Sequence, residues 1–342
     1  MVLTLVVLIF TIFALFWRVR LRNYASDIMS DAFDFPTTHL LKGIAAIIVV
    51  MIHFPEAYTN PLQKCIGSYA YIAVTYFFFV SAYGMEYSYN HRPDYLRRFW
   101  INRLSGLLIP MFLVNVLAYG YCLINRLHYA ERWTELLKFN HYVTILLEYC
   151  VLFYLLYKII VTRWIAQSIL IAVVTGSSLY YYFTLDSWST SVWPFERMGL
   201  VWGLLAYKYR SQMIVWMSRK NVRKAITLIF MTGLLGVAYI KFKPIYFWGA
   251  YLLKVALGVS FMLTIFTCAQ YLKFNNPIGR FLGNISYEIY LLHGLVMVYI
   301  IYITPEINSG MLVFITFICS ITVGWVISRI SSRLVRSIKK FL

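Results

Sequence analysis

Two ionisable residues, Lys42 and His53, stand at the ends of the apolar segment KGIAAIIVVMIH. Eleven residues advance an α-helix by about 16.5 Å and about 1,100°, so a helix would place both side chains within ~20° of one face. A lysine on such a stripe can hold an anion, and an imidazole further along it can accept a proton. The alternative is structural, because a lysine near a helix start can extend to the headgroups and a histidine close to Pro55 can lie at the interface.

Other ionisable residues lie within or beside apolar segments: Glu148, Glu196, Lys254, Glu288 and His293. An ionisable group in hydrocarbon must be paired, protonated or hydrated, which makes such residues candidates for a site. Glu288 and His293 are about 140° apart around a helix and so do not share a face. Glu148 and Lys254 could form a structural pair. Glu196 follows SWSTSVWPF, whose tryptophans fit sugar binding and equally fit an interfacial aromatic belt.

The elements that must position these residues are transmembrane helices. Of the 342 residues, 61% are hydrophobic and 13% are charged, which leaves too little polar surface for a soluble domain of this length. Many apolar runs approach the ~20 residues that cross a bilayer as a helix. We therefore expect an all-α polytopic membrane protein with about 11 transmembrane helices. Their expected ranges are 2–17, 40–55, 66–84, 104–125, 142–161, 164–184, 196–209, 225–240, 246–270, 284–303 and 310–328.

The expected domain organisation is an N-terminal part and one membrane domain. Residues 1–36 hold the first helix and a linker of basic and acidic residues, and residues 37–342 hold the other ten helices. The first helix lacks a basic start and a small-residue cleavage site, so we expect it to be retained rather than removed as a signal peptide.

The distribution of charge predicts the orientation in the membrane. Net charge is +18, from 31 Lys and Arg against 13 Asp and Glu, and 22 of the 31 fall on the side that holds the C-terminal tail. Basic residues mark cytoplasmic loops, which predicts an outer N-terminus and a cytoplasmic C-terminus in a plasma membrane of the bacterial cytoplasmic type. The basic excess then faces membrane lipids, and no aromatic and basic module for nucleic acid is recognisable.

The five cysteines are scattered along the chain and mostly lie in apolar segments. They form no C-x-x-C motif and no cluster with histidine. The cysteines therefore predict neither a metal site nor a disulfide framework. We also expect no bound cofactor.

Four motifs follow one another along the chain: Lys42-x10-His53, TYFFFVSAYGM (75–85), RRFWINRLSGLLIP (97–110) and FLGNISYEIYLLHGLVM (281–297). In this order they resemble the integral-membrane acyltransferase 3 family, over about residues 37–330. The resemblance implies an O-acyltransferase. Such an enzyme moves an acyl group, usually acetyl, from cytoplasmic acyl-CoA to a hydroxyl of a cell-surface polysaccharide or its lipid-linked precursor. Acyl-CoA would be a co-substrate rather than a resident cofactor.

Three positions depart from the family's usual pattern. Lys42 stands where arginine is usual, which replaces a bidentate grip on phosphate by a point charge. Residues 81–83 read Ser-Ala-Tyr in place of Ser-Gly-aromatic, and Leu107 occupies the place of a second arginine. These departures concern the residues expected to bind the donor rather than the fold.

Acyl transfer from a thioester to an alcohol needs a base, donors to the oxyanion and a cationic site for the CoA phosphates. His53 is the candidate base, since an ordinary imidazole pKa near ~6.5 suits proton abstraction near neutrality. Lys42, Arg98 and Arg103 are the candidate phosphate ligands because all three fall on the expected cytoplasmic side. For the arginines, the alternative is the ordinary basic loop of a membrane protein.

Further candidates would support these roles. Ser81 and Tyr83 could donate to the oxyanion or line the path of the pantetheine arm, although a small polar residue such as Ser81 also suits a simple helix contact. His293 could orient a substrate or merely satisfy a helix contact. The possible supporting residues are His293, Glu288, Glu148 and Glu196.

Two other functions remain open at this point. Intramembrane His, Glu and Lys also mark permeation routes, so a transporter or flippase for a glycan or an acyl group is one alternative. The absence of an inverted repeat speaks against it. A non-catalytic scaffold of a polysaccharide export machine is the other alternative, and the departures at the motif positions are its support.

Overall fold

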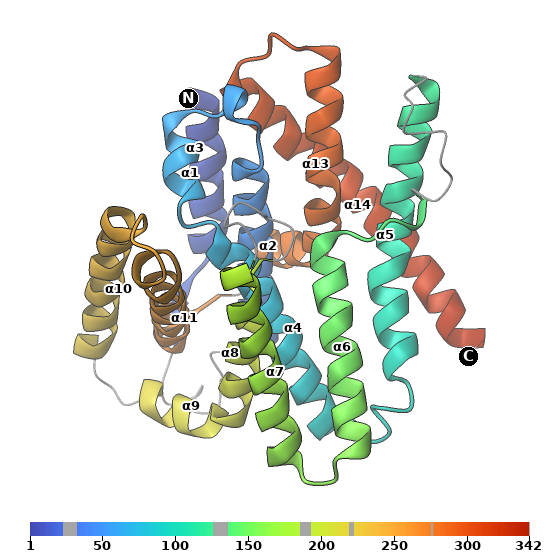
Figure 1. Cartoon of the computed structure of the whole chain (residues 1–342). Coiled ribbons are helices and arrows are strands. Elements are labelled where there is room, and N and C mark those ends of the chain that lie inside the picture. The colour runs from blue at the N-terminus through green and yellow to red at the C-terminus, as the bar shows by residue number, and fades with distance from the viewer. Residues whose placement is uncertain (23–32, 126–135, 185–192, 219–221, 275, 342) are drawn as a thin grey trace.

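The computed structural model describes residues 1–22, 33–125, 136–184, 193–218, 222–274 and 276–341, and they form a bundle of helices (Figure 1). The helices are α1 (Val2–Phe16), α2 (Phe35–Ile52), η1 (Glu56–Tyr58), α3 (Pro61–Gly67), α4 (Tyr71–His91), α5 (Phe99–Ile124), α6 (His141–Ile159), α7 (Arg163–Thr184), α8 (Met198–Lys208), α9 (Arg210–Ser218), α10 (Val222–Phe242), η4 (Trp248–Leu253), α11 (Lys254–Tyr271), α12 (Pro277–Asn284), α13 (Ser286–Ile303) and α14 (Ser309–Phe341).

Nine helical segments of the described residues are long and apolar enough to cross a membrane. They confirm an all-α, multi-pass membrane fold. Two other predicted spans are shorter, since α1 has 15 residues and α8 has 11. At ~1.5 Å per residue, α8 is about 16 Å long, roughly half of the ~30 Å hydrocarbon core. The predicted span 196–209 is therefore too short to cross alone.

The first core helix, α2, begins and ends earlier than the predicted span 40–55. The side chain of Asp34 caps it by accepting from the backbone N–H of Thr37 at 2.8 Å, and Pro36 occupies its first turn, where proline is favoured. Pro55 disfavours helical backbone at the preceding residue, and the helix ends at Ile52. His53 is consequently the first residue after α2 rather than a residue inside it.

The centre of the bundle is formed by α2 and α4, which lie in the two most buried spans. Helix α8 packs closely along α4, seen near the middle of Figure 1. Gly199 and Gly203 make this approach possible, because a Cβ at either position would lie 2.2 Å from the carbonyl oxygen of Thr75 or Phe79. Small residues four apart are a common means of bringing membrane helices together.

Two predicted spans are divided in the structure. The predicted span 66–84 becomes the short helix α3 followed by α4, and α3 starts from a capping box formed by Asn60 and Gln63. The predicted span 246–270 starts with the π-helical turn η4 before α11 continues it. Such turns are frequent at functional sites, and this one places Lys254 at the start of α11.

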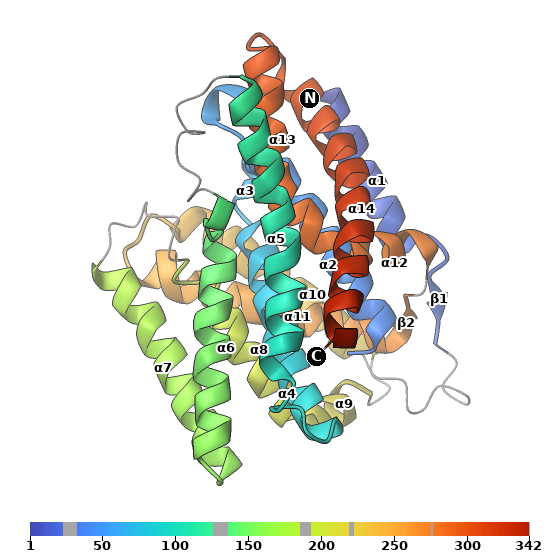
Figure 2. The ribbon, with the colours of Figure 1, turned by 90° about the vertical axis from the view of Figure 1, so that its right-hand side faces the viewer.

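The N-terminal helix α1 lies beside α14 (Figure 2), with the rings of Phe10 and Phe317 5.4 Å apart. The basic segment after it forms strand β1 (Arg20–Leu21), which pairs antiparallel with β2 (Leu272–Lys273). Arg22 is buried and forms an ion pair of 3.0 Å with Asp34. This short sheet was not predicted, and it ties residues that precede residue 37 to the end of α11.

Candidate active site

A cavity of about 590 Å³ lies where the ends of several helices meet. The residue after α2, the end of α3 and the starts of α4, α6 and α11 contribute to it, together with the middle of α13 and the segment before α8. We call it the histidine cavity. Its polar and aromatic lining residues are His53, Ser68, Tyr71, Asn140, His141, Trp193, Phe195, Glu196, Tyr239, Lys254, Tyr290 and His293.

Two imidazoles, His53 and His293, meet in this cavity with ring centroids 5.1 Å apart. Nδ1 of His53 lies 2.9 Å from the carbonyl oxygen of Val49, and Nδ1 of His293 lies 2.5 Å from that of Tyr290. A carbonyl oxygen can only accept, so each Nδ1 carries the proton and donates it. In the neutral rings, each Nε2 is therefore left with a lone pair that can accept a proton.

The start of α6 forms a polar wall of the cavity around Asn140, which caps that helix. Its Oδ1 accepts from the backbone N–H of Tyr142 at 3.0 Å and from the hydroxyl of Tyr290 at 3.1 Å. The backbone donor fixes Oδ1 as the acceptor, so the amide Nδ2 is the donor that Asn140 can offer. Ser81 reaches this wall through Tyr142, with the two hydroxyl oxygens 3.3 Å apart, while its hydroxyl also donates to the carbonyl of Phe77.

An ion pair between Lys254 and Glu196 lies on another wall of the histidine cavity. The Nζ and Oε1 atoms are 3.5 Å apart, and both side chains are largely buried, at 14% and 11% exposed. The ammonium of Lys254 also lies 3.7 Å from the centroid of the Phe195 ring. The pairing of Lys254 with Glu148 suggested by sequence is thus wrong, because Glu196 is the partner. Glu148 lines a different cavity, together with Arg197.

Lys42 does not line the histidine cavity. It is half-buried on α2 and lies near enough to Glu288 of α13 for their charges to interact. Glu288 is itself buried and accepts from the hydroxyl of Ser331 at 3.4 Å. Glu288 and His293 therefore lie in different surroundings, as their spacing predicts.

The other predicted donor-binding residues lie apart from the histidine cavity. Arg98 is exposed on the surface at the start of α5. Arg103 donates through Nη2 to the hydroxyl of Tyr95 at 3.2 Å. Tyr83 is buried in an aromatic cluster, with its ring centroid 5.0 Å from that of Phe33. Among the predicted site residues, the structure brings together His53, His293 and Glu196; Trp188 of the SWSTSVWPF segment lies outside the described residues.

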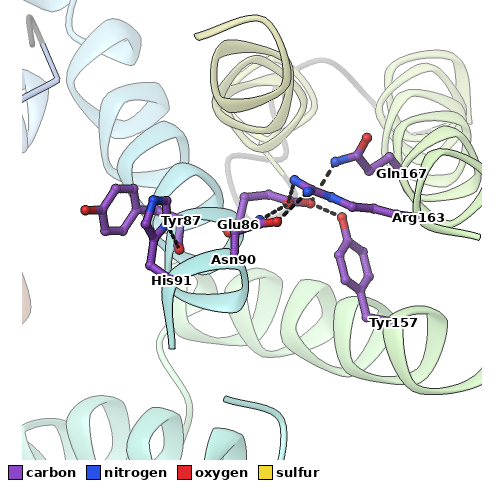
Figure 3. A network of polar contacts seen from close by, with 7 residues as sticks. All are labelled: Glu86, Tyr87, Asn90, His91, Tyr157, Arg163 and Gln167. Carbon is purple, nitrogen blue, oxygen red and sulfur yellow. Dashed lines mark hydrogen bonds and ion pairs between the residues drawn. The ribbon is translucent and has the colours of Figure 1, made fainter. Parts of the chain in front are cut away.

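Sequence reasoning missed a buried network at the opposite end of α4, centred on Glu86 (Figure 3). Glu86 is fully buried, and its Oε2 pairs with Nη2 of Arg163 at 3.0 Å. Gln167 donates to Oε1 at 3.4 Å, and the hydroxyl of Tyr157 donates to the same oxygen. Glu86 lies two residues beyond the predicted span 66–84, among apolar and aromatic residues, and that setting was the available signal.

The described residues contain no group of three or more His, Cys, Asp or Glu side chains that could hold a metal ion. The histidine cavity offers the facing imidazoles of His53 and His293, an amide donor and an ion pair. Fold and cavity together define a class, an integral-membrane protein with a polar cavity suited to group transfer.

The family follows from a comparison with known protein families. A family model described as an acyltransferase domain, of the acyltransferase 3 type, matches residues 37–329. Since this match covers most of the chain, the protein belongs to that family and is an acyltransferase, which confirms the resemblance of the four motifs. Searches of curated proteins and of solved structures found no match.

Proposed function

We propose that this protein is an O-acyltransferase that moves an acyl group, usually acetyl, from acyl-CoA to a hydroxyl of a cell-surface polysaccharide or its lipid-linked precursor. The observation that carries the proposal is the pair His53 and His293, which face one another at 5.1 Å in a polar cavity with Nε2 left as the basic nitrogen of each. Acyl transfer to an alcohol depends on such a base.

In the proposed reaction, Nε2 of His53 accepts the proton of the acceptor hydroxyl while the oxygen attacks the thioester carbonyl. The tetrahedral intermediate then collapses, the carbon–sulfur bond breaks and the ester forms. The departing CoA thiolate takes the proton back from the imidazolium, so no net proton is gained or lost. The carbonyl of Val49 keeps the ring oriented throughout, because it holds Nδ1–H at 2.9 Å.

Asn140 is the proposed donor to the oxyanion. Its Oδ1 is occupied by Tyr142 and Tyr290, which fixes the side chain and leaves the amide Nδ2 as a pre-positioned donor in the cavity wall. A donor held in place before the reaction stabilises the developing negative charge without reorganisation.

The remaining walls suit an acceptor rich in hydroxyl groups. Aromatic faces are supplied by Trp193, Phe195, Tyr71 and Tyr239, and polar groups are supplied by the ion pair of Glu196 with Lys254. A mostly apolar or aromatic surface with a few fixed polar groups is the usual composition of a small-ligand site. The basic loops support a cytoplasmic donor and an outer N-terminus, in a plasma membrane of the bacterial cytoplasmic type.

The test is transfer of labelled acetyl from acetyl-CoA in membrane vesicles that contain the protein and its native glycan acceptors. Wild-type protein should label an acceptor, and His53→Ala should reduce the rate by ~10²–10⁴, the usual contribution of a general base. Arg333→Ala is the control, since Arg333 lies at an exposed position on α14, outside the histidine cavity, and should leave the reaction at His53 intact. An acceptor labelled equally well by His53→Ala protein would contradict the proposal.

A further inference from the structure

A cavity of about 380 Å³ lies between α1, α2, α4 and α11, close to the end of α3. We call it the apolar cavity. Among the described residues that line it, none is charged and most are aliphatic. Three of them carry a hydroxyl group, and each hydroxyl donates to a backbone carbonyl oxygen: Thr11 to Val7 at 2.7 Å, Tyr69 to Gly236 at 3.1 Å and Tyr76 to Thr38 at 3.2 Å. A cavity of this kind offers water few partners, so it suits hydrocarbon.

Helix α1 forms one wall of the apolar cavity through residues 8–15. Two buried asparagines fix this helix near its ends. Nδ2 of Asn60 donates to the hydroxyl of Thr4 at 2.9 Å, and Nδ2 of Asn276 donates to the carbonyl oxygen of Ala14 at 3.0 Å. The helix lies outside the region that matches the acyltransferase family model. The apolar cavity is therefore completed by an element that precedes the matched domain.

The apolar cavity continues into a surface that faces lipid. Ile12 lines the cavity and is 50% exposed, and Ile9 and Phe13 beside it on α1 are exposed as well. On the side of α11, Phe261 and Ile265 line the cavity and are half-buried. A hydrocarbon chain can thus enter from the bilayer without crossing polar surface. Because lipid chains are as apolar as this lining, close packing must hold the chain there.

The apolar cavity is about as long as one leaflet of a bilayer. Its lining on α2 extends from Leu41 to Met51, which is about 15 Å at ~1.5 Å per residue. The hydrocarbon core of a bilayer is ~30 Å thick, so one leaflet measures about 15 Å. A cavity of this length along a membrane-spanning helix fits one extended lipid chain.

One end of the apolar cavity adjoins the histidine cavity. Met51 lines the apolar cavity, whereas His53, two residues later, lines the histidine cavity. Between α3 and α4, Tyr69 lines the apolar cavity, and the residues on either side of it, Ser68 and Ala70, line the histidine cavity. A lipid whose chain follows α2 in the apolar cavity therefore has its headgroup end beside the proposed base.

We propose that the apolar cavity binds the hydrocarbon chain of the acceptor, so that the acceptor at this site is a lipid-linked glycan and not a finished polysaccharide. The assignment rests on the proposed function. The chain anchors the acceptor, and the histidine cavity receives its sugar, which brings a hydroxyl to Nε2 of His53. Holding the acceptor in this way lowers the entropic cost of bringing the reactants together. The position beside His53 favours the acceptor over a phospholipid of the bilayer.

The test compares two acceptors that carry the same glycan. One is the glycolipid in a chloroform–methanol extract of native membranes, and the other is the glycan released from that extract by mild acid. Transfer of labelled acetyl from acetyl-CoA to each is measured with the full chain in phosphatidylcholine liposomes. The ratio of the two kcat/KM values, glycolipid over released glycan, reports how much the chain contributes.

Ala45→Phe and Ile48→Trp each place a larger side chain in the apolar cavity, and neither residue lines the histidine cavity. In both variants the ratio should fall by about tenfold or more, with kcat/KM for the released glycan unchanged. Ala172→Phe is the matched control, because Ala172 is exposed on α7 and is not among the residues that line either cavity. Its ratio should equal that of wild type. A lower folded fraction does not alter a ratio measured within one preparation.

The outcomes separate this proposal from the proposed function. If wild-type protein labels neither acceptor, the proposed function falls and this assignment falls with it. If wild type labels an acceptor and both α2 variants keep its ratio, the apolar cavity is not the site of the chain, while the proposed function stands. An equal loss of activity toward both acceptors would assign the cavity to a phospholipid that supports the fold, and would overturn the proposal.

Discussion

At His53 and at His293, a hydrogen bond to one backbone carbonyl determines which ring nitrogen can act as a base. Each carbonyl accepts from Nδ1, and this leaves Nε2 as the base. Val49 lies four residues before His53, and Tyr290 lies three residues before His293, so local helical backbone orients both rings. Within the part of the chain that the structure describes, the hydrogen bonds of both imidazoles go to backbone carbonyls and not to a carboxylate.

Asn140→Asp separates the two roles of that side chain. Aspartate caps a helix as well as asparagine does and keeps an acceptor for Tyr142 and Tyr290, but it has no amide donor. We expect kcat for acyl transfer to fall by ~10²–10³ with little change in thermal stability. Steady-state kinetics and a thermal melt of the same preparation measure both, and an unaltered kcat would remove Asn140 from the oxyanion site.

Glu86→Gln tests the buried network of α4. The substitution leaves Arg163 without its anionic partner, and we expect the free energy of unfolding to fall by about 1–3 kcal/mol. Glu56→Gln is the control, since the pair of Glu56 with Lys64 is 89% and 58% exposed and contributes little. Equal melting temperatures for the two variants, measured in detergent, would show that the network is not stabilising.

At the scale of elements, the position of α8 depends on its glycines. Gly203→Ala places a methyl group 2.2 Å from the carbonyl oxygen of Phe79 and should destabilise the protein by ~1–3 kcal/mol, as overpacking does. Gly233→Ala on α10 is matched to it, because a Cβ there meets no atom within 4 Å. In thermal denaturation, the melting temperature of Gly203→Ala should lie below that of wild type, and the melting temperature of Gly233→Ala should equal that of wild type. The reverse order would refute the close packing of α4 on α8.

Most of the helices could be predicted from the sequence, but fewer of the residues at which they begin and end could be. The cap at Asp34 and the proline at Pro36 were visible signals for an earlier start of α2, but apolar runs alone mark where a segment is hydrophobic and not where its backbone turns. The pairing of β1 with β2 joins residues about 250 positions apart in the chain, and no local pattern specifies such a contact.

For the candidate site, single residues could be predicted from the sequence, but their contacts with one another could not. His53 and His293 could be selected one by one because an imidazole in an apolar segment is costly. Their meeting across 240 residues of sequence, and the choice of Glu196 over Glu148 as the partner of Lys254, depend on which helix faces pack together. Periodicity gives the faces of each helix and does not say which faces meet.

At the scale of the whole molecule, two cavities lie toward opposite ends of helix α4. The ends of α2 and α3 lie at the histidine cavity, and the start of α7 lies at a second cavity, lined by Arg163, Lys208 and Arg210. From the charge bias along the chain, we propose that the donor enters from the cytoplasmic side and the acceptor from the outer side.

Cys65 on α3 reports the orientation without an added label. It is exposed and follows α2 on the side predicted to be outside. A membrane-impermeant maleimide applied to intact cells should therefore label wild-type protein and should fail to label Cys65→Ser. Labelling of Cys65 only after the cells are opened would invert the predicted topology.

The central claim is that His53 removes the hydroxyl proton during acyl transfer. It is tested most directly by the turnover of His53→Ala, reconstituted in liposomes with acetyl-CoA and acceptor, in the absence and presence of added imidazole. We expect kcat to fall by ~10²–10⁴, KM for acetyl-CoA to stay near the wild-type value, and imidazole to restore part of kcat. A wild-type kcat, or a loss confined to KM, would contradict the claim.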